Sequence, residues 1–351
     1  MKTREIFYTD PITQPLVNNG QARITGEDQE RTIKELQSEL RTFVCEGQYQ
    51  DGLVRMLSSY LGSLGKTNQP AAWVSGFFGS GKSHLLKMLA HLWQDTQFED
   101  GTTARTLVPQ MPPEVSDLLH ELDTAGKRNG GLLAAAGALP SGISDHVRLT
   151  VAGIILKALD LPERYHQARF CLWLKDQDAL DKVRAHVEDA GKDFSRELHN
   201  MYVSGSLAKA VIAALPDFAP NEQEAKAAVR AQFPQQTTDI TTEEFLLIVK
   251  QALTREGQIP CTVIVLDEAQ QYIGDSEDRA AFFTEAAEAL CKQLDSRVLL
   301  VASGQSALAT RGVLQKLKDR FTIKLELSDA DVETVTRKVL LQKKAKARDD
   351  V

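Results

Sequence analysis

The sequence predicts an α/β fold with a parallel central sheet and a helical insertion. Strand-like and helical patterns alternate in two stretches of the chain, about 66–159 and 241–328, whereas residues 160–240 are helical throughout and contain Ala-rich runs. Alternating strands and helices are typical of a parallel sheet covered by helices, and a long run of helices adds no strand to such a sheet. We therefore expect one α/β core divided by the insertion.

In the first half of the chain, apolar residues recur at three- and four-residue steps where helices are expected, and form short continuous runs where strands are expected. Glycines and prolines separate these patterns. The expected elements are helices over 27–43, 51–61, 82–93 and 143–159, and strands over 71–75 and 132–136.

In the second half, strand patterns return at 262–266, 297–302 and 322–327, and a helix over 279–294 separates the first two. A last helix is expected over 329–344. The resulting domain boundaries are 1–65 for a helical lead-in, 66–159 and 241–328 for the two halves of the core, 160–240 for the insertion, and 329–351 for a final segment.

The bulk composition excludes several classes of protein. The chain has 41 Lys and Arg against 48 Asp and Glu and an isoelectric point near 5.6, so it lacks an overall basic footprint for nucleic acid. It shows no apolar leader and no window of about 18 apolar residues, so we expect a cytoplasmic protein without membrane contact. Its four widely spaced cysteines predict buried free thiols.

One segment departs from the acidic average. Residues 311–348 contain 11 Lys and Arg against 5 Asp and Glu. Such a run suits a solvated helix face, and it also suits contact with nucleic acid or a partner.

The strongest motif is a glycine loop. Residues 76–83, GFFGSGKS, fit the pattern G-x-x-x-x-G-K-[ST] between an apolar strand and an amphipathic helix. Glycines allow left-handed backbone, so that successive N–H groups turn inward around an anion, and the following helix adds its positive N-terminus. The residues expected to contact a nucleoside triphosphate are Gly76, Phe77, Phe78, Gly79, Ser80, Gly81, Lys82, Ser83 and His84.

Three of these residues have distinct expected roles. Lys82 is expected to reach the β- and γ-phosphates as a mobile point charge, and Ser83 to supply its hydroxyl to Mg²⁺. His84 follows Ser83 on the helix, where packing or capping is expected in preference to catalysis. The base is expected near the region before the loop, around Gly47–Tyr49.

A second motif supplies the carboxylates of a hydrolytic site. Four apolar residues, Val263–Leu266, predict a buried parallel strand that ends in Asp267 and Glu268. Ligands bind at the carboxyl ends of such strands. We expect Asp267 to hold Mg²⁺ and Glu268 to act as general base toward the attacking water. Two solvated acids at a strand end are the alternative interpretation.

Further along the chain, Ser303 and Gln305 follow the strand over 297–302 and are candidates to contact the γ-phosphate or the water; an ordinary polar loop is the alternative. Arg320 precedes the last strand. It is a candidate arginine finger toward a neighbouring subunit's nucleotide, or else a solvated charge at a helix end.

Four stretches of the sequence resemble a known family. AAWVSGFFGSGKSHLLKMLAHLW (71–93), VIVLDEAQQYIG (263–274), LKDRFTIKLEL (317–327) and ELRTFVCEGQYQDGLVRMLSSYL (39–61) are similar to the BrxC/PglY family of ATPases from BREX phage-defence systems. The resemblance covers nearly the whole chain and is weakest over the helical insertion. It implies an AAA+-like P-loop NTPase fold.

The resemblance also implies roles for particular residues. Lys82 and Ser83 match the Walker A positions, Asp267 and Glu268 match Walker B, and Arg320 matches a finger position loosely. Family members are about three times longer on the usual domain sizes. We therefore expect an N-terminal piece, with 329–351 beginning a truncated C-terminal lid or linker, and weak turnover by this piece alone.

The expected function is an ATPase with ATP and Mg²⁺ as cofactors, acting as motor or switch in a bacterial complex that restricts phage DNA. The expected partners are other BREX proteins, including a DNA methyltransferase and an alkaline-phosphatase-like protein, with self-association and DNA contact left open. The alternatives are a nucleotide-gated scaffold with little hydrolysis and a DNA-binding module. A small-molecule kinase fits less well, because no separate acceptor site is visible.

Overall fold

The computed structural model describes residues 29–140, 146–305, 308, 312–328 and 338. Apart from Lys338, the helix expected over 329–344 and the lid or linker expected over 329–351 lie outside the described residues. The chain divides into two compact units. The sheet unit comprises 1–143 and 255–351, and the helical unit comprises 144–254.

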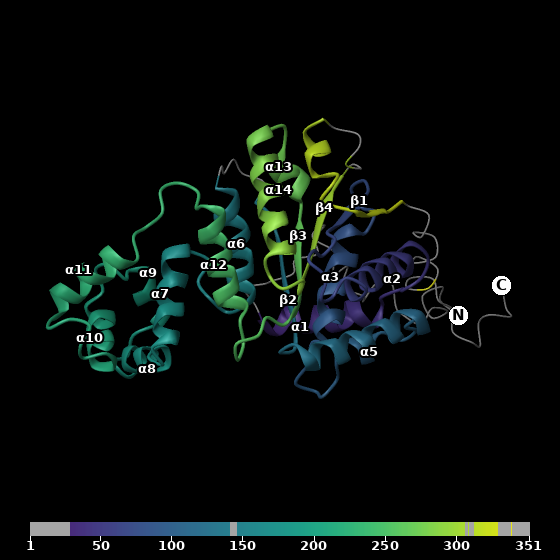
Figure 1. Cartoon of the computed structure of the whole chain (residues 1–351). Helices are drawn as coiled ribbons and strands as arrows, with labels where there is room; N and C mark the ends of the chain where they lie inside the picture. The colour runs from purple at the N-terminus through teal and green to yellow at the C-terminus, as the bar shows by residue number, and fades with distance from the viewer. Residues whose placement is uncertain (1–28, 141–145, 306–307, 309–311, 329–337, 339–351) are drawn as a thin grey trace, which may run out of the picture. The chain divides into compact units, whose positions relative to one another are not determined.

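The sheet unit contains a five-stranded, all-parallel sheet among its described residues, in the order β2-β3-β4-β1-β5 (Figure 1). The strands are β1 (Ala72–Ser75), β2 (Leu132–Ala138), β3 (Cys261–Asp267), β4 (Val298–Gly304) and β5 (Ile323–Glu326). The expected α/β class and parallel sheet are confirmed. All five expected strands are present, with ends shifted by one or two residues.

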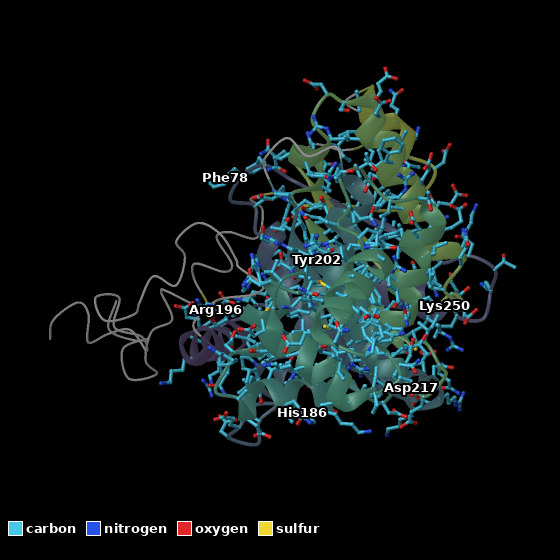
Figure 2. All side chains as sticks on the ribbon, turned by 90° about the vertical axis from the view of Figure 1, so that its left-hand side faces the viewer. Phe78, His186, Arg196, Tyr202, Asp217 and Lys250 are labelled. Carbon is cyan, nitrogen blue, oxygen red and sulfur yellow. The ribbon has the colours of Figure 1, made fainter. Side chains whose placement is uncertain are left out.

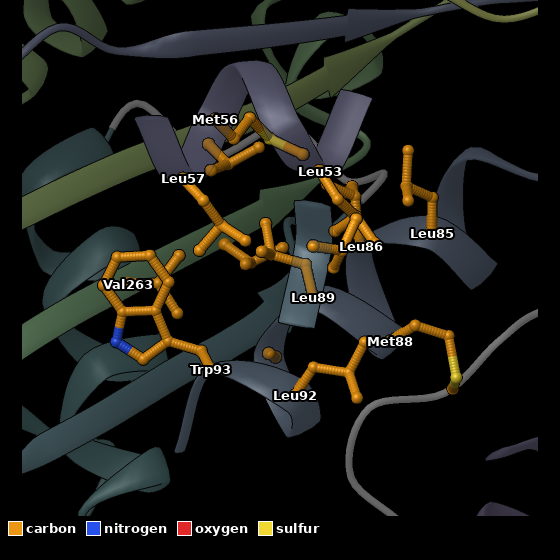
Figure 3. Close-up of a cluster of buried hydrophobic side chains, with 14 of the residues drawn as sticks. Leu53, Met56, Leu57, Leu85, Leu86, Met88, Leu89, Leu92, Trp93 and Val263 are labelled. Atoms are coloured by element: carbon orange, nitrogen blue, oxygen red, sulfur yellow. The ribbon is translucent and has the colours of Figure 1, made fainter. Parts of the chain in front are cut away.

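Both faces of the central strands are covered, which explains their apolar sequences. Every residue of β3 and β4 is buried. Since side chains alternate along a strand, Val263 and Val265 point to one face and Ile264 and Leu266 to the other. The first face packs on the helices that flank the glycine loop, including Leu86 (Figure 3).

The helices of the sheet unit are arranged around this sheet. Contacts place α2, α3 and α5 on the face of Val263, and α13 and α14 on β4 from the other face. The bounds are α1 (Gln29–Arg41), α2 (Gly47–Leu61), α3 (Lys82–Gln94), α4 (Ala104–Leu107), α5 (Pro113–Arg128), α13 (Ala269–Ile273), α14 (Glu277–Lys292) and a 3₁₀ helix η2 (Val313–Leu317).

One long helix was not expected from the sequence. The helix α5 lies in a region without an expected element, although Val115, Leu119 and Leu122 form a buried stripe at helical spacing. Pro113 lies in the first turn, where its missing N–H costs little. This helix packs on β2 and β3 and on α2.

The helical unit consists of seven α-helices among its described residues. They are α6 (Val147–Ala158), α7 (Tyr165–Asp176), α8 (Leu180–Asp189), α9 (Phe194–His199), α10 (Gly205–Ala214), α11 (Glu222–Gln232) and α12 (Thr242–Leu253). A separate apolar cluster, which includes Phe170, Val211 and Phe233, forms its core.

This unit is wider than the insertion expected over 160–240. The helices α6 and α12 had been placed in the two halves of the core, but they contact each other. Asp239 explains part of this arrangement, because its carboxylate accepts hydrogen bonds from the backbone N–H groups of Arg148 (3.1 Å) and Leu149 (3.0 Å). The first turn of α6 is thereby tied to the segment just before α12.

No helix in the described part of the chain combines the length and the apolarity that a bilayer span requires.

Candidate functional site

The ends of three neighbouring strands bring the sequence-predicted residues to one edge of the sheet. The strand β4 lies between β1 and β3, and the register pairs Ser75 with Gly304 and Leu266 with Ala302. The glycine loop that follows β1, the acidic pair at the end of β3 and Ser303 in β4 therefore share the carboxyl edge. Strands in a sheet are about 4.8 Å apart, so these groups lie within reach of one bound molecule.

The glycine loop has the backbone that its sequence predicts. Gly79 and Gly81 have φ of 87° and 83°, in the left-handed region that favours glycine. A Cβ atom on Gly76 would lie 2.6 Å from the carbonyl oxygen of Leu327, so a side chain has no room there. The loop leads directly into α3, whose first turn contains Lys82 and the half-buried Ser83.

Tyr49 braces the loop from outside the motif. It lies in the first turn of α2, and its hydroxyl donates a hydrogen bond to the carbonyl oxygen of Gly81 at 3.1 Å. A Cβ atom on Gly81 would lie 1.7 Å from the Tyr49 hydroxyl oxygen. Position 81 therefore requires glycine for two reasons, its positive φ angle and the close approach of the Tyr49 phenol.

Aromatic packing continues from Tyr49 to His84. The ring of Phe43 stacks on Tyr49 at 5.8 Å between centroids and meets His84 edge-on at 5.6 Å. Burial, together with the positive charge of Lys87, lowers the pKa of His84 to about 4. His84 is accordingly neutral near pH 7 and packs, as expected, against the rings of Phe43 and Tyr49.

The side chain of Lys82 is folded back over the loop. Its Nζ donates to the carbonyl oxygens of Gly76 (2.6 Å) and Phe77 (2.9 Å). Partial burial lowers the pKa of Lys82, while the nearby Asp267 opposes that shift. The ammonium group therefore occupies the mouth of the loop and lies within electrostatic reach of the carboxylate at the end of β3.

The other side chains of the loop divide into exposed and buried. Phe77 and Phe78 are 52% and 82% exposed. Figure 2 labels Phe78 at the edge of the molecule. Since an aromatic ring carries no donor for a phosphate oxygen, these two residues can offer a phosphate only their backbone N–H groups. Ser80 is buried, and among the described residues its hydroxyl has no hydrogen-bond partner.

The acidic pair is held by Ser303. The Ser303 hydroxyl donates to Oδ1 of the buried Asp267. The backbone N–H of Glu268 donates to the same Oδ1 (2.9 Å) and to Oγ of Ser303 (3.0 Å). Both hydrogen bonds to the carboxylate go to Oδ1, and no hydrogen bond joins Oδ2 of Asp267 to a described residue.

Glu268 adopts a backbone conformation that is uncommon for its type. Its φ of 60° and ψ of 24° lie in the left-handed region, at the start of α13. Burial, and secondly the charge of Asp267, raise the pKa of Glu268. A half-buried carboxylate with a raised pKa is suited to accept a proton near neutral pH.

Two further candidates lie away from this cluster. Gln305 is exposed just beyond the end of β4. Arg320 is only 8% exposed, and its Nη2 donates to the carbonyl oxygen of Gln69 at 2.7 Å. Gln69 precedes β1, at the edge of the sheet opposite the glycine loop. This burial does not favour the finger role predicted for Arg320, which requires an exposed guanidinium.

Sequence reasoning from motifs missed the role of Tyr49 as a brace, although it pointed to Gly47–Tyr49 as a base-binding region. It also missed Gln270 of α13, whose side chain packs against Gly304 so closely that a Cβ atom there would lie 2.7 Å from Oε1. Gln270 lies only two positions after Glu268, and this short spacing could have indicated that it belongs to the same site.

Comparison with known proteins adds no identification. No protein-family model matches the chain. No solved structure gives a significant match to it.

Proposed function

We propose that this chain is an AAA+-like P-loop ATPase that binds ATP with Mg²⁺ and hydrolyses it at the carboxyl edge of its sheet. The observation that carries the proposal is the meeting of two motifs at one edge: the glycine loop before α3, and the Asp267–Glu268 pair fixed by Ser303. Either motif alone is a common turn or strand end, but together they supply phosphate binding and water activation.

Phosphate binding rests on the loop backbone and Lys82. Left-handed glycines turn successive N–H groups inward, and the N-terminus of α3 adds a partial positive charge. Nζ of Lys82 now donates hydrogen bonds to the carbonyl oxygens of Gly76 and Phe77, and it does so at the end of a flexible side chain. A triphosphate entering the loop offers Nζ stronger, charged acceptors, so Lys82 exchanges the two carbonyls for phosphate oxygens.

The residues present fit a magnesium ion held mainly by phosphate and water. Magnesium typically takes one or two protein oxygens in such sites, and Ser83 with Oδ2 of Asp267 would supply them. Bound there, the ion would offset charge on the β- and γ-phosphates. Among the described residues, no group of three or more His, Cys, Asp and Glu forms a separate metal cage.

Hydrolysis is assigned to Glu268. Its carboxylate accepts a proton from the attacking water while the water oxygen bonds to the γ-phosphorus and the bond to the bridging oxygen of ADP breaks. Its raised pKa makes it a better proton acceptor than an ordinary glutamate, and its bonded backbone N–H fixes where the side chain begins.

The strand order supports the AAA+-like assignment through geometry. With β4 between β1 and β3, Ser303 stands between the phosphate loop and the acids, where its hydroxyl orients Asp267. The sequence resemblance to BrxC/PglY proteins extends the proposal to a motor or switch within a BREX defence complex, with a DNA methyltransferase and an alkaline-phosphatase-like protein among its partners.

The test compares wild type with Glu268→Gln and Lys82→Ala. Wild type is expected to bind a fluorescent ATP analogue in the presence of Mg²⁺ and to release phosphate. Glu268→Gln should retain binding and lose release, whereas Lys82→Ala should lose both. If wild type and Glu268→Gln bind nucleotide equally and both release phosphate at the background rate, the chain is a nucleotide-gated scaffold instead.

A further inference from the structure

The glycine loop is held at both of its ends by residues outside the motif. At its start, a Cβ atom on Gly76 would lie 2.6 Å from the carbonyl oxygen of Leu327, so the chain just after β5 lies directly against this position. At its end, the hydroxyl of Tyr49 donates to the carbonyl oxygen of Gly81 at 3.1 Å. The two outside contacts come from different elements, the end of β5 and the first turn of α2.

The side chain of Gln48 joins these two elements to each other. Its Nε2 donates to the hydroxyl oxygen of Ser328 at 2.8 Å, and its Oε1 accepts from the backbone N–H of Ser328 at 2.8 Å. The amide therefore uses both of its polar atoms on one residue, which lies 280 positions away in the sequence. Consecutive residues of a helix point about 100° apart, so Gln48 can reach Ser328 while Tyr49 reaches Gly81.

The strand end that this amide binds is itself fixed to the sheet. The backbone N–H of Leu327 donates to the carbonyl oxygen of Ser75 at 2.8 Å, one residue before the glycine loop begins. The buried hydroxyl of Ser75 donates to the carbonyl oxygen of Leu325 at 3.1 Å. The residues that enclose the loop from outside, which we call the loop clamp, are Gln48, Tyr49, Leu327 and Ser328.

The composition of the loop explains why such support matters. The loop contains three glycines, Gly76, Gly79 and Gly81, and glycine loses more conformational freedom on ordering than any other residue. A loop that already has its binding shape before the ligand arrives does not bear this cost during binding. The hydrogen bonds from Lys82 also hold the loop, but a phosphate would take them over, whereas the contacts of the loop clamp do not involve Lys82.

We propose that Gln48 is a positioning residue for phosphate binding: it joins α2 to the end of β5 and thereby holds the glycine loop in its binding shape. This inference rests on the proposed function, because it takes the loop to bind the phosphates of a nucleotide. Gln48 acts through Tyr49 and Leu327, which contact the loop at Gly81 and Gly76. The ligand group that depends on the loop clamp is therefore the polyphosphate chain and not the base.

The experiment measures two ligands on the full chain in the presence of Mg²⁺. A fluorescent ATP analogue is titrated directly, and tripolyphosphate, which has no base, is measured by its displacement of the analogue. Gln48→Ala removes both hydrogen bonds to Ser328, and Tyr49→Phe removes the hydroxyl at Gly81 while it keeps the ring. The matched control is Gln50→Ala, which changes the same residue type two positions further along α2. The melting temperature of each variant is recorded without ligand.

Gln48→Ala should weaken the binding of both ligands by the same factor, about three- to tenfold, because two hydrogen bonds of ordinary strength are lost. Tyr49→Phe loses one such bond and should weaken both ligands by about threefold. Gln50→Ala should bind both ligands as wild type does. The addition of Ser328→Ala to Gln48→Ala should cause no further loss, since the two residues share the interaction that is removed.

Three outcomes overturn the proposal. A loss confined to the ATP analogue, with tripolyphosphate binding unchanged, would place Gln48 against the base. A lower melting temperature of Gln48→Ala with both affinities unchanged would make its bonds to Ser328 a purely structural contact, and the proposed function would stand without the loop clamp. If wild type binds neither ligand, the proposed function fails and the role of Gln48 fails with it.

Discussion

Nζ of Lys82 lies 2.6 Å from the carbonyl oxygen of Gly76, so the lysine of the glycine loop is hydrogen-bonded to the loop itself. Nζ also donates a hydrogen bond to the carbonyl oxygen of Phe77. These bonds keep the ammonium group at the mouth of the loop, where a phosphate would enter. If the loop binds ATP as proposed, Lys82 exchanges these two carbonyl acceptors for charged phosphate oxygens.

Removal of Lys82 should separate nucleotide binding from stability. Lys82→Ala loses a charged hydrogen bond to phosphate worth about 1.5–3 kcal/mol, so ATP affinity should fall by roughly 10–150-fold. The unliganded protein should keep its melting temperature, because the two carbonyls released can bond to water. Titration of a fluorescent ATP analogue and thermal melting check the two quantities.

The control for Lys82→Ala is Lys66→Ala, which removes an exposed lysine that precedes β1 at the opposite edge of the sheet. Equal losses of ATP affinity in the two variants would show that Lys82 acts only through the net charge.

Loss of the Ser303 hydroxyl should slow hydrolysis more than it weakens binding. Ser303 fixes Oδ1 of Asp267 and accepts from the N–H of Glu268. Ser303→Ala releases both, and supporting residues of this kind typically contribute 10–100-fold, so we expect kcat to fall by about tenfold. The ATP affinity, set mainly by the glycine loop, should change by less than about threefold.

Steady-state phosphate release and analogue binding measure this split, with Ser303→Thr as the control that keeps a hydroxyl. A variant in which the KM rises and kcat stays constant would place Ser303 in substrate binding and not in the positioning of the acids.

The sequence was sufficient for features that depend on neighbouring residues. The apolar run before Asp267 predicted β3, and the glycine pattern predicted the left-handed positions of Gly79 and Gly81, because each follows from local sterics. The parallel sheet followed from the alternation of strands and helices.

Features that depend on distant residues could not be predicted in the same way. The phenol of Tyr49 reaches Gly81 across 32 positions of sequence, and no local pattern indicates that approach. The sequence predicts Arg320 as an arginine finger or a solvated charge at a helix end, but the carbonyl of Gln69, 251 positions away, provides a buried acceptor. The width of the helical unit likewise depends on the long-range contacts of Asp239.

Acid should destabilise the nucleotide-free protein through His84. Burial and the charge of Lys87 lower its pKa from 6.5 to about 4. Between these values the unfolded chain binds a proton that the folded chain does not, so stability falls as the pH falls from 6.5 toward 4. His84→Gln should flatten this dependence in urea unfolding curves recorded between about pH 7 and pH 5, above the range where most carboxylates titrate.

His186→Gln is the control, because His186 is exposed on α8 in the helical unit. His91 contributes in the same direction, since burial and Lys87 also lower its pKa to about 4. His84→Gln should therefore remove part of the dependence. An unchanged pH profile in His84→Gln would show that His84 titrates alike in the folded and unfolded chain.

A last prediction distinguishes a structural Arg320 from an arginine finger. Arg320 is buried and donates to the carbonyl of Gln69, whose own side-chain amide donates to the carbonyls of Tyr60 (3.1 Å) and Ser296 (2.8 Å). Arg320→Ala leaves the Gln69 carbonyl without its charged donor, so the free energy of unfolding should fall by about 1.5–3 kcal/mol.

The exposed neighbour Lys318 provides the matched control, and Lys318→Ala should leave stability unchanged. A finger acts on a neighbour's nucleotide and not on the fold of its own chain. If Arg320 is a finger, Arg320→Ala should keep the wild-type denaturation midpoint, and its phosphate release should no longer rise with protein concentration. Urea denaturation and phosphate release at several protein concentrations therefore give opposite patterns for the two roles. Because Arg320 is buried, we expect Arg320→Ala to lower the free energy of unfolding and to leave the concentration dependence of phosphate release unchanged.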